Sequence, residues 1–175
     1  SPHSGVVFCG RYWDKKTYLR RKNYQKILAV SNNLASQSIP VVFIGPGWDQ
    51  LIPADNPYIS LCNLKYSHYP VAYNLGKLFV SLSIHEGGPL PLLESMCCGC
   101  YPLVTNTGFA SDILKSDDFG RLINSFSSVP ALVDLISSFH NSVSFDSFSP
   151  VVRQRASKFS FDNFTSTLYS IFKSW

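Results

Sequence analysis

The stretch Ser83–Glu94, SIHEGGPLPLLE, decides the fold of this chain, because it joins a buried apolar run to a helix through two adjacent glycines. The run before it, Lys77–Leu82, is largely apolar, as expected for a strand that is covered on both faces of a parallel sheet. Pro89 and Pro91 favour the first turn of a helix, where the missing amide hydrogen removes no helical hydrogen bond. The stretch therefore predicts a strand, a tight loop and a buried helix over Pro91–Cys98.

Short apolar runs alternate with helical patterns along the rest of the chain. Apolar runs predict further strands at Val6–Cys9, Val41–Ile44, Tyr58–Leu61, Tyr101–Val104 and Arg121–Ile123. Helical spacing of apolar residues, or a proline at the first turn, predicts further helices at residues 23–34, 70–75, 130–139, 151–158 and 162–173. The Ser- and Phe-rich residues 141–150 are predicted to form a loop. This alternation predicts an α/β fold, a Rossmann-like parallel sheet with helices on both faces.

In an open α/β sheet, ligands bind outside the carboxyl ends of the strands, so the loops that follow the strands are the candidate site. Those loops begin at Gly10, Gly45, Ser83 and Thr105. Glycines let the backbone approach a ligand closely, and the amide groups and dipole at the start of the helix after Gly88 favour a phosphate. The sequence therefore predicts an anion-binding site around the Gly-rich loop.

The composition is that of one globular domain. The 175 residues are 45% hydrophobic and 15% charged, which provides enough apolar material for a core. The net charge of +4 fits an ordinary surface, and it leaves open an anionic ligand such as a diphosphate or a contact with an anionic membrane. A charge this small argues against nucleic acid as a partner. The basic residues between Lys15 and Lys22 are interpreted as the solvated face of a helix.

The cysteines are five, an odd number, and Cys97, Cys98 and Cys100 are crowded together. Because a secreted disulfide framework usually has an even number, we expect reduced thiols of a cytosolic protein. The crowded three are predicted to be small core residues and not metal ligands. No apolar run approaches the ~20 residues of a membrane helix, and we expect no signal peptide at Ser1–Gly5, which lacks the pattern of one. Since the chain lacks an initiator Met and opens almost directly into a strand, we expect it to be cut from a longer protein.

The spacing of Glu86 and Glu94, with seven residues between them, resembles the E-x7-E motif of glycosyltransferase family 4, the glycosyl transferases group 1. The stretches at residues 78–96, 99–108, 112–114 and 120–123 continue the resemblance. The opening Phe8–Arg11 is similar to the family's first strand with its phosphate-binding arginine. The resemblance covers nearly the whole chain, and it implies one half of a GT-B fold, the C-terminal, donor-binding domain.

This resemblance implies that residues 1–175 are a single donor domain whose N-terminal acceptor domain is absent. It implies binding of a UDP- or GDP-sugar and transfer of the sugar, with retention of configuration, to a glycan, a lipid or a small molecule, as in polysaccharide biosynthesis. The family needs neither a cofactor nor a metal. The expected location is the cytoplasm, and association of the full-length protein with a membrane stays open. The domain alone is expected to be inactive, because the active site of this fold lies between two domains.

The resemblance also assigns roles to single residues. Arg11 and a lysine are expected to contact the donor diphosphate; Lys16 and Lys22 are both candidates, and Lys22 is preferred because it runs into the helix as in the family pattern. Glu86 is expected to face the hydroxyls of the transferred sugar, and Glu94 those of the ribose. Arg11, Lys22 and Glu86 would act in catalysis, since prepositioned groups stabilise charge on the leaving diphosphate. The donor is also expected to meet the loop residues Gly10, Gly87, Gly88, Pro89 and Leu90.

Two other enzyme classes fit these residues less well. Eight steps along a helix would separate Glu86 and Glu94 by ~12 Å, whereas glycoside hydrolases hold their carboxyl groups about 5–9.5 Å apart. A nicotinamide dehydrogenase would need G-x-G-x-x-G after its first strand, where this chain has GRYW from Gly10. A non-catalytic sugar-nucleotide-binding or protein-interaction module of the same fold stays open as the alternative, and exposed aromatic residues on the last helix would favour it.

Overall fold

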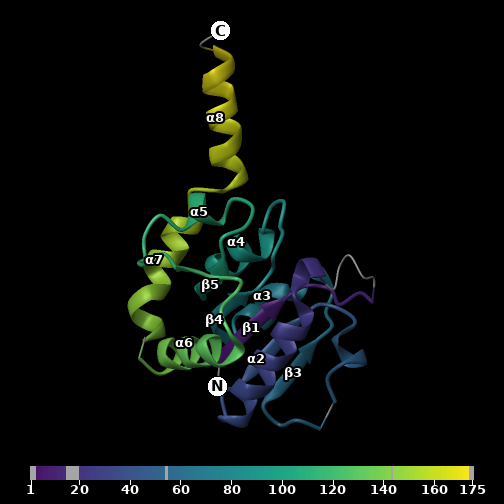
Figure 1. Ribbon diagram of the computed structural model, residues 1–175. Coiled ribbons are helices and arrows are strands. Elements are labelled where there is room, and N and C mark those ends of the chain that lie inside the picture. The colour runs from purple at the N-terminus through teal and green to yellow at the C-terminus, as the bar shows by residue number, and fades with distance from the viewer. Residues whose placement is uncertain (1–2, 15–19, 54, 143, 174–175) are drawn as a thin grey trace.

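The computed structural model describes residues 3–14, 20–53, 55–142 and 144–173. In this part of the chain, six parallel strands form one sheet in the order β3-β2-β1-β4-β5-β6 (Figure 1). The strands are β1 (Gly5–Cys9), β2 (Val41–Ile44), β3 (Ile59–Cys62), β4 (Gly76–Ser81), β5 (Tyr101–Thr105) and β6 (Arg121–Ile123). The predicted parallel sheet is confirmed, and each strand end lies within one residue of its predicted position.

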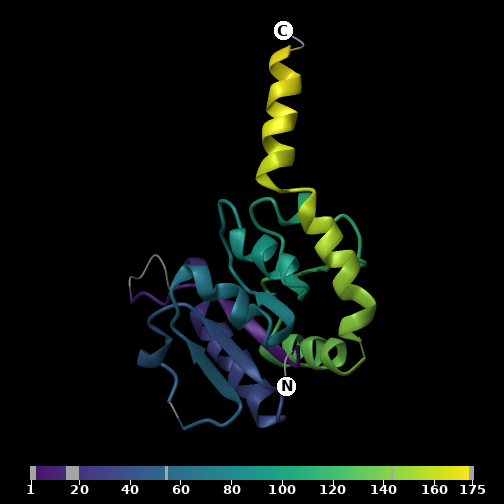
Figure 2. The ribbon, with the colours of Figure 1, turned by 180° about the vertical axis from the view of Figure 1, so that it is seen from behind.

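Helices cover both faces of the sheet (Figures 1 and 2). The described helices are α2 (Tyr24–Ser36), α3 (Tyr69–Tyr73), α4 (Leu90–Cys97), α5 (Ala110–Ile113), α6 (Val129–Ser142), α7 (Phe145–Ser157) and α8 (Phe161–Lys173), with single 3-10 turns η1 (Trp48–Gln50) and η2 (Tyr66–His68). On one face α2 packs against α6, and on the other α4 packs against both α3 and α7. The fold is therefore the predicted Rossmann-like α/β fold.

Burial on both faces explains the continuous apolar runs of the central strands. Val6 and Val7 of β1 and Leu78 of β4 are fully buried. Next to them, Phe8 of β1 stacks on Phe43 of β2 with the ring centroids 5.3 Å apart. A strand covered on one face only would alternate apolar and polar residues, so the uninterrupted pattern follows from the two helical layers.

The predicted loop at residues 141–150 is largely helical, so that prediction was wrong. The helix α7 begins at Phe145 and contains Pro150. Pro150 is the sixth residue of α7, so its missing amide hydrogen removes a hydrogen bond of the helix. However, the helix buries Phe148, whose ring centroid lies 5.3 Å from that of Tyr101 in β5. The packing of an aromatic side chain thus outweighs the weak helical preference of the local sequence.

The crowded cysteines are only partly in the core. Cys98 and Cys100 are buried as predicted, but Cys97 is exposed, so the prediction was wrong for Cys97. Cys97 is the last residue of α4, and the turn of the helix directs it away from the sheet. All five cysteines are free thiols.

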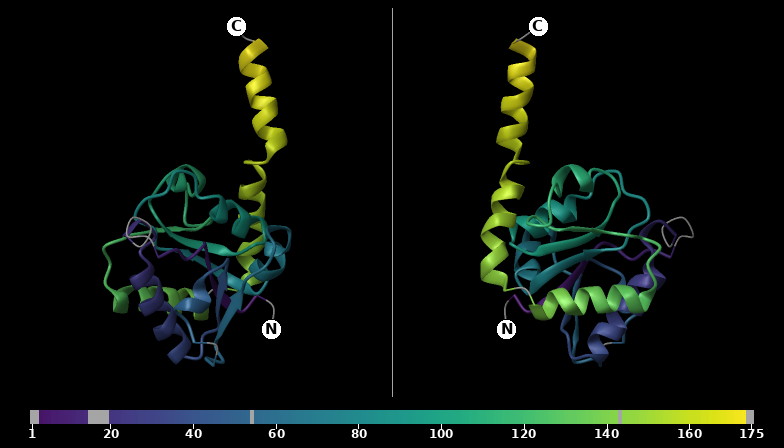
Figure 3. Two further views of the ribbon diagram at one scale, coloured as in Figure 1. Left: turned by 90° about the vertical axis from the view of Figure 1, so that its right-hand side faces the viewer. Right: turned by 60° about the vertical axis from the view of Figure 1, so that its left-hand side comes forward.

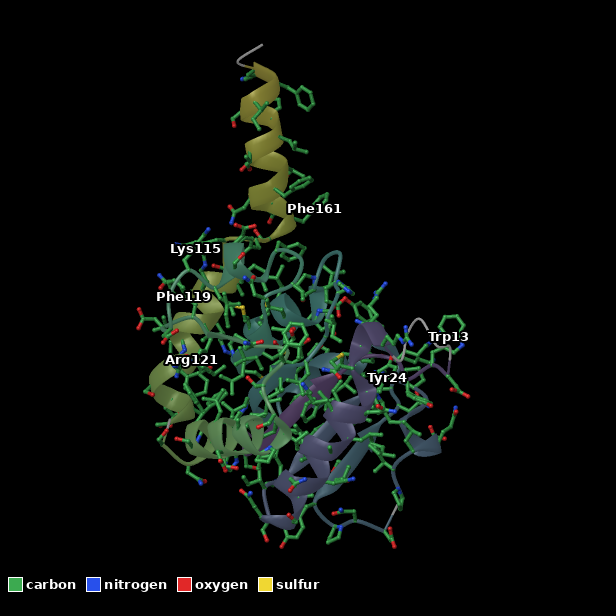
Figure 4. All side chains as sticks on the ribbon, viewed as in Figure 1. Trp13, Tyr24, Lys115, Phe119, Arg121 and Phe161 are labelled. Atoms are coloured by element: carbon green, nitrogen blue, oxygen red, sulfur yellow. The ribbon has the colours of Figure 1, made fainter. Side chains whose placement is uncertain are left out.

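The last helix, α8, projects from the body of the molecule, on the side away from the N-terminus (Figures 1 and 3). None of its residues is buried. Phe161 marks its base (Figure 4), and a cavity of about 370 Å³ there is lined by Phe109, Phe159 and Phe164 among others. In the described part of the chain, no helix is long and apolar enough to cross a bilayer.

Candidate functional site

The order of the strands locates the place where a ligand would bind. The chain crosses the sheet in one direction from β1 to β2 and in the other from β4 to β5, so the order reverses between β1 and β4. Ligands of such sheets bind in the crevice outside the carboxyl ends of the strands at this point. Cys9 ends β1 and Ser81 ends β4, so the loops after these two residues form the candidate site.

A close glycine contact holds the loop after β1 against the loop after β2. The Gly10 amide donates a hydrogen bond to the Ile44 carbonyl oxygen at 2.9 Å. A Cβ atom on Gly45 would lie 2.6 Å from the Gly10 carbonyl oxygen, and φ of Gly45 is +115°, so this position requires glycine. The Tyr24 hydroxyl donates to the Arg11 carbonyl oxygen. The backbone at Arg11, the residue predicted to bind phosphate, is therefore held both by the loop after β2 and by Tyr24.

The side chain of Arg11 is exposed at the rim of the site. Its guanidinium carbon lies 6.0 Å from the ring centroid of Trp13, which stands at the outer edge of the molecule (Figure 4). Burial raises the pKa of Tyr69, the first residue of α3, and the positive charge of Arg11 partly opposes this rise. Arg11 is thus within electrostatic range of α3.

The loop after β4 is tied to residues 20–23, which come much earlier in the chain. The Ile84 amide donates to the Arg21 carbonyl oxygen at 2.8 Å, and the Asn23 side chain donates to the Leu82 carbonyl oxygen at 3.2 Å. Asn23 has a φ of 58°, a left-handed conformation that asparagine tolerates. It separates the helical residues 20–22 from α2, and the two hydrogen bonds hold this segment beside the loop.

An ion pair joins the two segments. Lys22 donates from Nζ to Oε1 of Glu86, and Nη2 of Arg21 lies 3.8 Å from Oε2 of the same carboxylate. The Glu86 side chain is only 11% exposed, and a carboxylate with so little access to water requires cations such as these two beside it. The structure thus brings together Lys22 and Glu86, while Lys16 lies outside the described residues. The sequence predicted that Arg21 lies on a solvated helix face. Only its position next to Lys22 indicated that it could also lie beside Glu86.

The Gly-rich loop leads directly into α4, which begins at Leu90, one residue earlier than predicted, with Pro89 as its N-cap. The Leu90 amide donates to the Gly88 carbonyl oxygen at 2.8 Å, so it is already engaged within the loop. A Cβ atom on Gly88 would lie 2.8 Å from the Phe109 ring, whereas one on Gly87 would meet no atom within 4 Å. The space beside the Gly87 backbone is therefore free for a ligand.

Glu94, on α4, faces a separate cleft. Tyr66 donates from its hydroxyl to Oε1 of Glu94 at 2.5 Å, and Tyr73 donates to Oε2 at 3.0 Å. The cleft between α3 and α4 has a volume of about 390 Å³, and its lining includes Tyr66, Tyr69, Tyr73, Leu93 and Glu94. The sequence did not single out either tyrosine, because a tyrosine near a helix is most often a packing residue.

A match to known proteins bears on what these groups do. Residues 15–145, most of the chain, match the family model described as glycosyl transferases group 1. The chain belongs to the glycosyl transferases group 1 family. The matched region includes Lys22, Glu86 and Glu94, while Gly10 and Arg11 precede it. No curated protein sequence matches this group 1 chain.

Solved structures share the fold of this group 1 member. A sucrose-phosphate synthase from Thermosynechococcus elongatus has a TM-score of 0.75 at 15% identity, over 98% of this chain and 45% of its own. The pneumococcal O-GlcNAc transferase GtfA, in complex with UDP and GlcNAc, has a TM-score of 0.74 at 16% identity, over 98% and 35%. A mutant of S. aureus TarM, in complex with fondaparinux, alpha-GlcNAc-glycerol and UDP, has a TM-score of 0.75 at 18% identity, over 97% and 35%. The chain therefore spans less than half of each of these proteins.

Cys9, at the end of β1, lines a small pocket together with Lys22 and Glu86. Burial raises the pKa of the Cys9 thiol to about 12; a hydrogen bond with Tyr73 and the charge of Lys22 oppose the rise, and Glu94 adds to it. The thiol is therefore protonated at neutral pH, and it lies within electrostatic range of both Lys22 and Glu94. Among the residues that the structure describes, no three or more His, Cys, Asp and Glu side chains form a group that could hold a metal ion.

We expect Cys9 to resist alkylation in the folded chain, whereas Cys97 reacts readily. With a pKa of about 12, only about one Cys9 thiol in ten thousand is ionised at pH 8. Burial also raises the pKa of Cys97, but Cys97 is exposed. Peptide mass spectrometry after brief iodoacetamide treatment measures the alkylated fraction of each cysteine. A urea-unfolded sample is the control, in which both cysteines should react alike. Rapid labelling of Cys9 in the folded chain would contradict the closed packing around it.

Proposed function

We propose that this chain is the donor-binding domain of a retaining glycosyltransferase of family 4, and that it forms the C-terminal half of a GT-B enzyme. The observation that carries the proposal is the position of the ion pair of Lys22 and Glu86, which lines one small pocket with Cys9 at the point where the strand order reverses, with the charge of Glu94 within reach of the same thiol. A site at this point, next to a helix start and lined by cations, suits a nucleoside-diphosphate sugar. Membership of the group 1 family supports the same function.

In this proposal, breaking the bond between the sugar and the diphosphate leaves negative charge on the phosphate oxygens. Lys22, Arg11 at the rim and the open backbone at Gly87 would stabilise that charge. Removal of one such preorganised donor typically costs about 3 kcal/mol in the transition state. Since Lys22 is bound to Glu86 before the donor arrives, the phosphate would share Lys22 with Glu86, and Arg21, 3.8 Å away, would keep the Glu86 charge balanced.

The two glutamates would recognise the two ends of the donor. Glu86 would accept hydrogen bonds from the hydroxyls of the transferred sugar, and Glu94 from those of the ribose. UDP is bound in the structures of pneumococcal GtfA and S. aureus TarM, which supports a uridine donor, with guanosine as the other candidate. No cofactor or metal enters the proposal. The acceptor, a glycan or a lipid, would be bound by a further domain, and the reaction would take place in the cytoplasm.

Nucleoside diphosphates are expected to stabilise the chain against heat. A ligand at about 100 times its dissociation constant stabilises the folded state by about 2.7 kcal/mol, which for a domain of this size raises Tm by roughly 5–11 °C. The measurement compares uridine, guanosine, adenosine and cytidine diphosphates, each with the wild type and with Arg11→Ala. We expect one of the first two to raise Tm, and the rise to be smaller in the variant.

The other candidate function is a module for protein contacts, and the exposed helix α8 favours it. Phe161, Phe164 and Phe172 are 76%, 58% and 73% exposed, and the described residues leave this aromatic surface uncovered. If no nucleoside diphosphate raises Tm even at millimolar concentration, the donor-binding proposal fails and this second function becomes the better one.

A further inference from the structure

The two tyrosines that hold Glu94 differ sharply in burial. Tyr73, at the end of α3, is 1% exposed, and its hydroxyl oxygen lies 3.0 Å from Oε2 of Glu94. Tyr66, in the single turn η2, is 67% exposed, and its hydroxyl oxygen lies 2.5 Å from Oε1. Each carboxylate oxygen therefore receives one phenol hydrogen, one from the core and one from the surface.

The contact from Tyr73 is built into the core. Its ring packs edge-on against Phe79 of β4, with centroids 6.3 Å apart. Because the side chain is almost fully buried, the packing around it fixes the place of the hydroxyl group. The hydrogen bond from this hydroxyl to Oε2 thus orients the Glu94 carboxylate.

The contact from Tyr66 is suited to exchange. Its ring meets Tyr69 edge-on at the surface, with centroids 5.3 Å apart. An exposed hydrogen bond has a small net free energy, because water or a ligand hydroxyl can replace the donor. Both tyrosines line the cleft of about 390 Å³, whose mostly apolar wall with one carboxylate suits a nucleoside.

We propose that Tyr73 is a positioning residue that aims Glu94 at the ribose of the donor, and that a ribose hydroxyl displaces Tyr66 from Glu94. The inference rests on the proposed donor-binding function, and it adds which side chains set the affinity for the ribose. In the bound state Oε2 keeps its hydrogen bond from Tyr73, while Oε1 exchanges the Tyr66 hydroxyl for a hydroxyl of the ribose.

The two tyrosine-to-phenylalanine variants are expected to shift affinity in opposite directions. Isothermal titration calorimetry measures the dissociation constants of UDP, 2′-deoxy-UDP and 3′-deoxy-UDP for each variant. The guanosine compounds are used instead if GDP is the stabilising nucleotide. Tyr73→Phe should weaken UDP binding on the order of tenfold and weaken binding of at least one deoxy analogue much less, because the lost contact acts through Glu94. Tyr66→Phe should strengthen UDP binding severalfold, because no hydroxyl then competes. Tyr58→Phe, before β3, is the matched control and should bind like the wild type.

Each result separates the inference from the function on which it rests. If Tyr73→Phe weakens UDP and both deoxy analogues equally, Tyr73 has only a structural role and the positioning claim is overturned. If Tyr66→Phe weakens UDP binding, Tyr66 is a lasting contact of the nucleotide and the displacement claim is overturned. In both cases the wild type still binds the nucleotide and the proposed function stands. A wild type that binds no nucleoside diphosphate overturns the function itself.

Discussion

Replacing Lys22 with methionine is expected to weaken binding of the nucleoside diphosphate by about 100-fold. The substitution removes the cation that bonds to Glu86 and leaves a carboxylate, 11% exposed, with Arg21 at 3.8 Å as its remaining partner. The lost charge-assisted contact to phosphate and the repulsion from Glu86, whose charge Arg21 alone then balances less completely, both act against an anion. Together these effects amount to about 3 kcal/mol, which corresponds to roughly 100-fold in Kd.

Titration calorimetry with UDP checks this prediction, and the chain offers two controls. Lys115→Met removes the same charge from an exposed pair with Asp112, 3.4 Å apart, and should leave Kd within about twofold. The double variant Lys22→Met with Glu86→Gln removes both charges, so it should recover at least about tenfold of the lost affinity. Binding of UDP by Lys22→Met as tight as by the wild type would transfer the phosphate-binding role to Lys16 or another group.

Replacing Gly45 with alanine is expected to destabilise the chain by about 3 kcal/mol. The new Cβ atom would lie 2.6 Å from the Gly10 carbonyl oxygen, and alanine would have to adopt a φ of +115°. Backbone atoms cannot move aside as the end of a flexible side chain can, so the loop that carries Arg11 must shift. Strain in this part of φ space alone costs about 1–3 kcal/mol, and the collision adds to it.

Urea unfolding monitored by circular dichroism gives the free energy of unfolding for this comparison. Gly87→Ala is the matched control, because its Cβ would meet no atom within 4 Å, and it should change stability by less than about 0.5 kcal/mol. We also expect Gly45→Ala to bind UDP more weakly, since Arg11 would be displaced. An unchanged unfolding midpoint for Gly45→Ala would show that the two loops do not approach each other as closely as the structure describes.

Most of the fold could be predicted because its signals are local. The apolar runs at Val6–Cys9 and Val41–Ile44 became adjacent buried strands, and the glycines that follow them became the turns at the edge of the sheet. The prediction failed for residues 141–150, where Phe148 is buried against a strand that lies far away in the chain. A serine-rich local sequence does not indicate that such a distant contact will form.

The sequence predicted where Glu86 and Glu94 lie in the fold but not which side chains contact them. The pattern predicted Glu86 in the loop after a strand and Glu94 in the helix that follows, and the structure has both residues there. Their partners come from three other segments: Arg21 and Lys22 from the segment before α2, Tyr66 from η2 and Tyr73 from α3. No spacing rule relates these segments to one another, since their distance depends on how the whole chain folds.

The sequence by itself determined the parallel sheet, the order of strands and helices along the chain, and the loops that could form a site, because burial on two faces and glycine turns act over a few residues. Only the tertiary structure decided which cations neutralise Glu86 and which hydroxyls hold Glu94. Those contacts depend on single backbone conformations, such as the left-handed Asn23, and on side chains brought together by the reversal between β1 and β4. These contacts result from long-range packing, which local sequence patterns do not predict.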